Sequence, residues 1–287
     1  MSLLDDLSGE IEEEKQISIK KDLSPVQDAG DYVIVRNIEC VDADGNVFEK
    51  HDELWIPKDV ERDKNYVKSF SVYGAIVHCE EKGNDWFLPS AAATLNYLLK
   101  IFPKAVRKRS DGNYHTINEE FKKVLDIFYN GQDQFFGVLA QNSLVAFGKS
   151  EIIHYPKKED FTYASGDVGI NFNRDSIRLE FDNSNLEVCC LLDGLENKGI
   201  ERFVRQYSGV ANPEELLNLG DYYGWLSNGD KHSRLWFSSN YEGSMNFSDT
   251  FALRIFCDTY NPYLNICADI NLDNSFSASG VRYIPPS

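Results

Sequence analysis

Short runs of apolar residues bounded by turn residues dominate the chain and predict strands. A continuous run covers residues 32–38, and Asp44-Gly45 ahead of Val47-Phe48 is typical of a hairpin turn. Polar residues divide the later runs, and Asn142-Ser143 separates two of them in this way. The other expected strands lie at residues 67–79, 86–88, 135–140, 144–147, 177–181, 186–192, around 225, 235–237, 251–257 and 264–270.

Four segments show the spacing of apolar residues that is typical of helices. Ser90 can cap a helix over residues 91–102 that Pro103 ends. A capping box at residues 116–119 begins a second helix, which ends near Gly131. The third and fourth helices cover residues 200–207 and 212–220. Because strands occur in clusters and helices in pairs, the expected fold class is α+β, with antiparallel sheets and a few packed helices.

The first thirty residues are expected to form an acidic, partly flexible N-terminal arm. Residues 2–16 place four apolar side chains at helical spacing, although Gly9 and three consecutive glutamates weaken a helix there. Residues 20–30 have the composition of a flexible lead-in. The arm either orders on a partner or second subunit, or is a frayed tail. Residues 31–287 are expected to form a single α+β domain with a weak seam at residues 155–169.

The composition is that of a folded protein with a strong acidic excess. Of the 287 residues, 42% are hydrophobic and 13% aromatic, which is enough to build a large core. The formal net charge of −17 disfavours direct binding of nucleic acid, because the molecule repels phosphate. No apolar stretch approaches a membrane span, and the N-terminus lacks a signal-peptide pattern. These features predict a soluble, cytoplasmic protein.

No catalytic motif identifies a reaction. The chain has neither a Gly-x-Ser-x-Gly pentapeptide nor a phosphate-binding glycine loop. Its six cysteines are expected to be reduced core residues, and Cys79 beside His78 is the nearest approach to a zinc site. Asp269, Asn271 and Asp273 match three positions of a calcium loop whose glycine and closing glutamate are missing. We therefore expect no cofactor and no metal, while a carboxylate pair scattered in sequence remains an open alternative.

Two further clusters each have a structural and a functional interpretation. Tyr222, Tyr223 and Trp225 could form an aromatic sugar platform, but such residues are more typical of a core or an interface. Residues 104–109, Lys-Ala-Val-Arg-Lys-Arg, are the only dense basic cluster in the chain. A contact to nucleic acid is one explanation, but a solvated loop between two helices, or a contact to the acidic arm within one chain or across a dimer, is favoured over it.

The acidic excess is concentrated in the first part of the chain. Residues 1–63 carry a net charge of −11, and the remaining 224 residues carry −6. If residues 33–55 form a hairpin, several of its acids share one solvent face and attract a cationic partner. Plain solubility is the alternative explanation of this charge. The candidate partner-binding residues are Asp42, Asp44, Glu49, Asp52, Glu53, Asp59, Glu61 and Asp63.

In its size, its charge and these acidic positions, the chain resembles phage-encoded host-takeover proteins, in particular giant-phage inhibitors of the bacterial RNA degradosome. The resemblance implies an acidic homodimer that covers the basic RNA-binding segments of RNase E and inhibits RNA turnover by occlusion, without catalytic residues. The resulting hypothesis is a non-enzymatic protein of the host cytoplasm whose partner is a basic RNA-binding protein such as RNase E. The alternatives are a hydrolase or transferase with a scattered carboxylate pair, and a structural virion or assembly protein.

Overall fold

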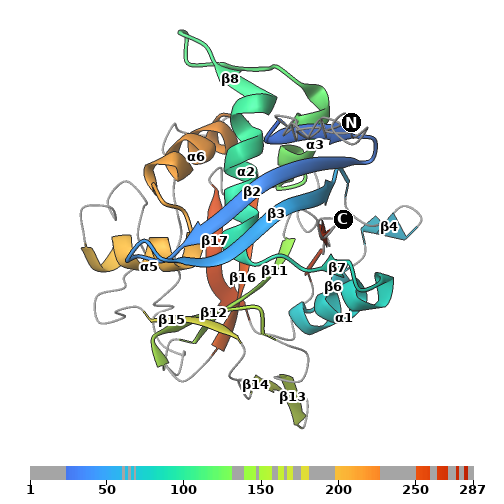
Figure 1. Cartoon of the computed structure of the whole chain (residues 1–287), viewed down its shortest axis with the longest axis vertical. Helices are drawn as coiled ribbons and strands as arrows, with labels where there is room; N and C mark the ends of the chain where they lie inside the picture. Colours follow the sequence, from blue (N-terminus) through green and yellow to red (C-terminus); the bar gives the residue numbers. More distant parts are fainter. Residues whose placement is uncertain are drawn as a thin grey trace, which may run out of the picture.

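The structure, a computed structural model, describes residues 24–59, 62–63, 66–67, 69–130, 139–146, 149–156, 161–164, 167–170, 176–180, 198–226, 250–258, 264–270, 276–277 and 281–283. Within these residues the chain has the expected α+β fold (Figure 1). Two larger sheets, three two-stranded sheets and five helices are described.

The first sheet has the strand order β1-β2-β3-β19-β7, and all neighbouring strands are antiparallel. Its strands are β1 (Val26–Ala29), β2 (Tyr32–Val41), β3 (Val47–Pro57), β19 (Val281–Tyr283) and β7 (Trp86–Phe87).

Strands β2 and β3 form a long hairpin with one face against the core. Val33 and Val35 are buried in the first half of β2, whereas Ile38 and Cys40 are buried in the second half. The alternation shifts by one residue at Asn37, which has a positive φ of 56°. This local kink keeps both halves of the hairpin packed on the core.

The second sheet has the main strand order β10-β16-β11-β12-β15, with β17 beside β16 and β18 between β11 and β6. Its strands are β6 (Ser69–Phe70), β10 (Tyr129–Asn130), β11 (Leu139–Ala146), β12 (Glu151–His154), β15 (Ile177–Glu180), β16 (Thr250–Asp258), β17 (Asn265–Ile270) and β18 (Phe276–Ser277). The pairs β10–β16 and β11–β18 are parallel, and the others are antiparallel. The two-stranded sheets pair β4 (Arg62–Asp63) with β5 (Tyr66–Val67), β8 (Val106–Lys108) with β9 (Tyr114–Thr116), and β13 (Phe161–Ala164) with β14 (Asp167–Ile170).

Helix α2 (Ala91–Ala105) is the centre of the fold. It packs between β2 of the first sheet and β11 of the second, as Figure 1 shows, and three other helices flank it. Leu95, Leu98 and Ile101 are fully buried, as are the alanines of its first turn. A helix that is apolar on nearly all sides is stable only when it is surrounded in this way. The other described helices are α1 (Val72–Lys82), α3 (Glu119–Asp126), α5 (Lys198–Ser208) and α6 (Glu214–Leu226).

The core consists of two clusters of buried residues. The larger joins residues from Val26 to Leu264 around α2, and the smaller packs α1 against the second sheet. The expected seam at residues 155–169 contains β13, whose Phe161 belongs to the smaller cluster. Among the described residues, no helix combines the length and the apolar character needed to cross a bilayer.

The strand expected over residues 67–79 is wrong, because most of it is helix α1. Ser71 is the N-cap, and its Oγ accepts a hydrogen bond from the Gly74 N–H at 3.1 Å. The buried residues Val72, Ala75 and Cys79 follow helical spacing. A continuous apolar run has no clear period of its own, so it does not distinguish a strand from a buried helix.

The turn expected at Asn142-Ser143 is also wrong, because β11 runs straight through these residues. Its pairing with β16 shifts between Ala140 and Leu144, which is the signature of a β-bulge. Gln141, Asn142 and Ser143 are all buried, so their polar groups belong to the core rather than to a surface turn.

Several helix boundaries differ from the expected ones. α2 continues past Pro103, which lies in its last turn, so the backbone hydrogen bond that the proline removes is lost near the end of the helix and not in its middle. α3 begins after Asn118, whose Oδ1 accepts from two backbone N–H groups, whereas Thr116 of the expected capping box lies in β9. α3 also ends before β10 rather than near residue 131. α6 runs past Gly220 and includes Trp225, which we expected near a strand.

The expected arm is shorter than thirty residues. Residues 26–29 form β1, which pairs with β2 and buries Val26. Residues 1–23 lie outside the described residues, as do the expected strands at residues 186–192 and 235–237.

Candidate partner-binding surface

The turn between β2 and β3 is organised by Asp42. Its Oδ1 accepts hydrogen bonds from the backbone N–H groups of Asp44 and Asn46 at 2.9 and 2.8 Å, and its Oδ2 accepts from the Asn46 side chain. Partial burial raises the pKa of Asp42, but these hydrogen bonds outweigh it and the pKa is lowered overall. Asp42 is therefore a stable anion that fixes the shape of the turn.

Helix α5 holds this turn in place from the side. Arg202 donates a two-pronged hydrogen bond to Asp44, from Nη1 to Oδ1 at 2.9 Å and from Nη2 to Oδ2 at 3.0 Å. The Ala43 N–H donates to Gln206 Oε1 at 3.0 Å. Just beyond the helix, the Gly209 carbonyl accepts from the Val41 N–H at 2.9 Å. These contacts hold the turn in a fixed position against α5.

The eight candidate acids do not share one solvent face. Asp42 and Asp44 lie in the turn, while Asp52 in β3 and Asp59 just after it are exposed. Glu53 is partly exposed, and Glu49 is 6% exposed and faces the core. The backbone of Asp63 lies in β4, and Glu61 lies outside the described residues. Glu49 therefore does not belong to the solvent face on which we expected several of these acids to lie.

Ion pairs within the chain neutralise much of the acidic charge along the first sheet. Arg36 Nε contacts Glu53 Oε2 at 2.8 Å, and Lys50 Nζ contacts Glu39 Oε1 at 2.7 Å. Lys58 makes two such contacts, both at 2.6 Å, to Asp28 and Glu120. Exposed ion pairs contribute little stability, but they reduce the field of the acids that form them.

Acidic side chains outnumber basic ones at the turn, which we name the hairpin tip: Asp42, Asp44 and Val47, with the neighbouring Glu180 and Arg202. Asp44 pairs with Arg202, and the negative charges of Asp42 and Glu180 add to that of Asp44 in raising the pKa of the guanidinium. Val47 is 53% exposed, which makes it one of two exposed large hydrophobic residues among those described. An anionic cluster beside an apolar side chain fits a cationic side chain with a long aliphatic stem.

Glu49 forms a buried polar network at the start of α2. Its carboxylate accepts from the Ser90 hydroxyl and contacts His51 Nε2, both at 2.6 Å, and it accepts a short hydrogen bond from Tyr155. Burial raises the pKa of Glu49, but the hydrogen bonds from His51, Ser90 and Tyr155 lower it by a larger amount. The pKa is therefore lowered overall, and the group stays ionised. Ser90 is also the N-cap of α2 and accepts from the Ala93 N–H at 2.9 Å. Glu49 therefore ties the hairpin to the central helix.

Ser143 and His154 form a second buried pair that superficially resembles a nucleophile and its base. Ser143 Oγ lies 2.7 Å from His154 Nδ1, and His154 Nε2 lies 3.1 Å from the Gln206 carbonyl. Both side chains are fully buried, Ser143 Oγ also accepts from the Ala91 N–H, and the Phe48 ring stacks on the imidazole. Burial lowers the pKa of His154, which favours the neutral ring. With no room for a substrate, the pair is a structural link between β11, β12 and α5.

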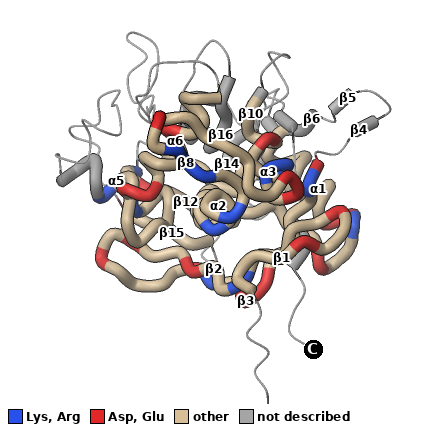
Figure 2. Tube along the Cα trace, turned by 90° about the horizontal axis from the view of Figure 1, so that it is seen from above, with Lys and Arg blue, Asp and Glu red and all other residues tan. Residues whose placement is uncertain are grey.

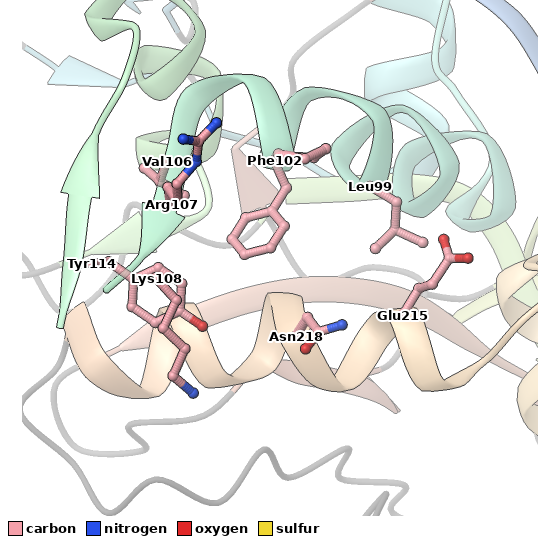
Figure 3. A pocket seen from close by; sticks show the side chains of 9 residues that line it. Leu99, Phe102, Val106, Arg107, Lys108, Tyr114, Glu215 and Asn218 are labelled. Atoms are coloured by element: carbon pink, nitrogen blue, oxygen red, sulfur yellow. The ribbon is translucent and has the colours of Figure 1, made fainter. Parts of the chain in front are cut away.

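The basic cluster at residues 104–109 borders a pocket between α2, β8 and α6, with a volume of about 450 Å³ (Figure 3). Apolar side chains such as Leu99, Phe102 and Tyr114 line it, and Arg107 and Lys108 belong to its polar lining. In Figure 2, basic positions lie around the end of α2 and β8. Lys108 contacts Asp221 at 3.2 Å and lies over the Tyr114 ring. Burial and the Asp221 charge raise the pKa of Tyr114 to about 12.

The remaining candidates are the calcium-like sequence, the aromatic cluster and the cysteines. No group of three or more side chains in the described part of the chain could hold a metal ion. Asp269 lies in β17, whereas Asn271 and Asp273 lie outside the described residues. Tyr222 and Tyr223 are fully buried and therefore belong to the core, which is one of the two roles that the sequence favoured over a sugar platform. The described free cysteines, Cys40 and Cys79, are buried, as expected.

No family model, curated protein or solved structure matches the chain. The candidate surface therefore depends on its geometry alone. Sequence analysis missed Glu180, Arg202 and Gln206, because each meets the hairpin across a large separation in the chain. The only relevant signal was the amphipathic pattern of residues 200–207, which predicts a packed helix but not what it packs against.

Proposed function

We propose that this is a non-enzymatic acidic protein that binds the basic RNA-binding surface of a host protein and thereby inhibits RNA turnover. The partner in this proposal is an Arg/Lys-rich segment of a protein such as RNase E, in the host cytoplasm. The protein acts by occlusion, so it needs no cofactor and carries out no reaction of its own. A homodimer would present the acidic surface twice and raise the affinity for a repetitive basic segment.

The observation that carries the proposal is the two-pronged pairing of Arg202 with Asp44 at the hairpin tip, in a turn that also holds the anionic Asp42. The Arg202–Asp44 contact already has the geometry of arginine recognition. An arginine of the partner can therefore pair with Asp44 in place of Arg202 or with the remaining acids beside it. The Val47 side chain offers apolar contact for the aliphatic part of the incoming side chain.

The anchoring of the hairpin tip also supports binding. Because Gln206 and Gly209 hold the turn independently of Arg202, the acids lose little conformational freedom when a partner binds. The charge also speeds the encounter with a cationic segment, and salt weakens this effect.

The test is the equilibrium binding of an arginine-rich RNA-binding peptide, measured by fluorescence anisotropy at low and high salt. Asp44→Asn removes an anion and should weaken binding about fivefold, which corresponds to roughly 1 kcal/mol. Arg202→Ala should instead strengthen binding, because it leaves Asp44 without its internal partner. Because Arg202→Ala also makes the net charge more negative by one unit, a charge change elsewhere on the surface is needed to show that the peptide binds at the hairpin tip.

Glu81→Gln is the matched control, since Glu81 is an exposed acid on α1 and its loss changes the net charge as much as Asp44→Asn does. Equal weakening by Asp44→Asn and Glu81→Gln would indicate attraction to total charge and would contradict a specific surface. Failure of the wild-type protein to bind at low salt would overturn the proposal altogether.

A further inference from the structure

We propose that the pocket at the end of α2 is the docking site for the acidic N-terminal segment of the same chain, residues 2–16. The pocket combines apolar walls, formed in part by Leu99, Phe102 and Tyr114, with the cationic side chains of Arg107 and Lys108 (Figure 3). A ligand that fits it needs both an apolar face and negative charge.

The cations at this pocket exceed what their surroundings neutralise. Lys108 contacts Asp221, but among the described residues no ion pair or hydrogen bond involves the side chain of Arg107 or of the nearby Lys104. Both are exposed. Glu215 also lines the pocket on the side of α6. The surplus is therefore positive along α2 and β8, in a molecule whose total charge is −17.

Residues 2–16 have the complementary chemistry. They contain six acids and one lysine. Leu3, Leu4, Leu7 and Ile11 recur at helical spacing, so a helix over this segment would present one apolar stripe flanked by carboxylates. The stripe suits the apolar walls of the pocket, and the carboxylates suit Lys104 and Arg107.

The first described residues lie beside elements that are connected to the walls of the pocket. Asp28 of β1 shares Lys58 with Glu120 of α3, and the Ile117 N–H just before α3 donates to the Ala105 carbonyl at the end of α2. The first described residues are thus linked by a few contacts to the elements around the pocket. Residues 17–23, when extended, span about 23 Å.

Docking of the segment would cover the only dense basic cluster of the chain. It would also place the segment's carboxylates against the chain's own cations, so that they are not available to a basic partner. This inference concerns a different surface from the hairpin tip and does not depend on the proposed partner.

Zero-length carbodiimide crosslinking of the full-length protein tests the proposal, because the reaction joins a carboxylate directly to a lysine amine. An equal mixture of nitrogen-15-labelled and unlabelled protein shows whether the two ends come from one chain. We expect crosslinks from carboxylates of residues 5–14 to Lys104 or Lys108 within a single copy. The Glu120–Lys123 pair, 2.8 Å apart, is an internal standard for the reaction.

Two variants should lower this crosslink yield about fivefold relative to the standard: Arg107→Glu, which reverses a pocket charge, and Leu7→Asp, which interrupts the apolar stripe. Lys50→Glu is the matched control, since it reverses an exposed charge on the hairpin and should leave the yield unchanged. Absence of the N-terminal crosslinks while Glu120–Lys123 forms would overturn the proposal. Crosslinks that join labelled to unlabelled copies would also overturn it, because the occupant would then be the segment of a second copy.

Discussion

Replacement of Gly209 by alanine should destabilise the protein more than replacement of Gly30, Gly45 or Gly83, which also have a positive φ. Gly209 follows α5 with a φ of +59°, where its carbonyl accepts from the Val41 N–H and from the Asn96 side chain. A Cβ at this position would lie 2.7 Å from Cys40 Cβ and 2.8 Å from Ala92 Cβ. Neither atom can rotate away, because each is attached directly to the backbone. The segment after α5 would therefore have to move away from the hairpin and from α2.

The expected loss can be divided into two parts. A left-handed backbone costs a non-glycine residue about 1–2 kcal/mol, and overpacking of a close contact costs about 1–3 kcal/mol. Gly209→Ala should thus reduce the free energy of unfolding by about 2–5 kcal/mol. Gly45→Ala is the control, because Gly45 has a φ of +86° with nothing within 4 Å of the added Cβ, so only the first part applies.

Urea unfolding followed by circular dichroism measures both variants against the wild type. We expect Gly209→Ala to lose at least 1 kcal/mol more than Gly45→Ala, as a rough minimum from the overpacking term. Equal losses in the two variants would refute the close approach of α5, the hairpin and α2 on which the anchored hairpin tip depends.

Three further predictions concern the buried groups beside the hairpin. Glu49→Gln should destabilise the protein by about 1–3 kcal/mol at pH 7 in urea unfolding. Because the folded pKa of Glu49 is lowered, the stability that its charge contributes is complete above the unfolded pKa of about 4.3 and is lost as the pH falls through the folded pKa. The variant should therefore lose less stability on acidification than the wild type. Ser90→Ala removes both a helix cap and a hydrogen bond to Glu49 and should lower the free energy of unfolding by about 2–4 kcal/mol. Ser71→Ala removes only the cap of α1 and should lower it by about 1 kcal/mol. Equal losses of stability in thermal unfolding would contradict the double role of Ser90. Cys40 and Cys79 should react with a thiol reagent only on unfolding, because both are buried and burial raises the pKa of Cys40; peptide mass spectrometry after labelling of the native protein would reveal any early reaction.

Local patterns were sufficient to predict the elements whose signals lie within a few residues. The β2–β3 hairpin followed from its apolar runs and the Asp-Gly turn, and the start of α2 from the Ser90 cap. The same reasoning failed for α1 and for β11. In α1 a continuous apolar run concealed the helical period, and in β11 the polar side chains of Gln141 and Ser143 are buried because α2 and β12 supply their hydrogen-bond partners.

The candidate site was predicted only in part, because its residues meet through contacts between distant parts of the chain. The acidic character of the turn is visible in the sequence, but burial of Glu49 depends on Ser90 and Tyr155, which are distant in the chain. Likewise, Arg202 reaches Asp44 across 158 residues, so the balance of charge at the hairpin tip depends on the tertiary fold. Sequence charge alone therefore overestimated how many of the eight acids face solvent together.

The most direct test of the central claim is displacement of RNA. A labelled RNA is bound to an arginine-rich RNA-binding segment, and its anisotropy is followed while the acidic protein is added at physiological salt. We predict release of the RNA, with Asp44→Asn requiring about fivefold more protein than the wild type and Glu81→Gln requiring the same amount as the wild type. RNA that stays bound at saturating wild-type protein would contradict the account.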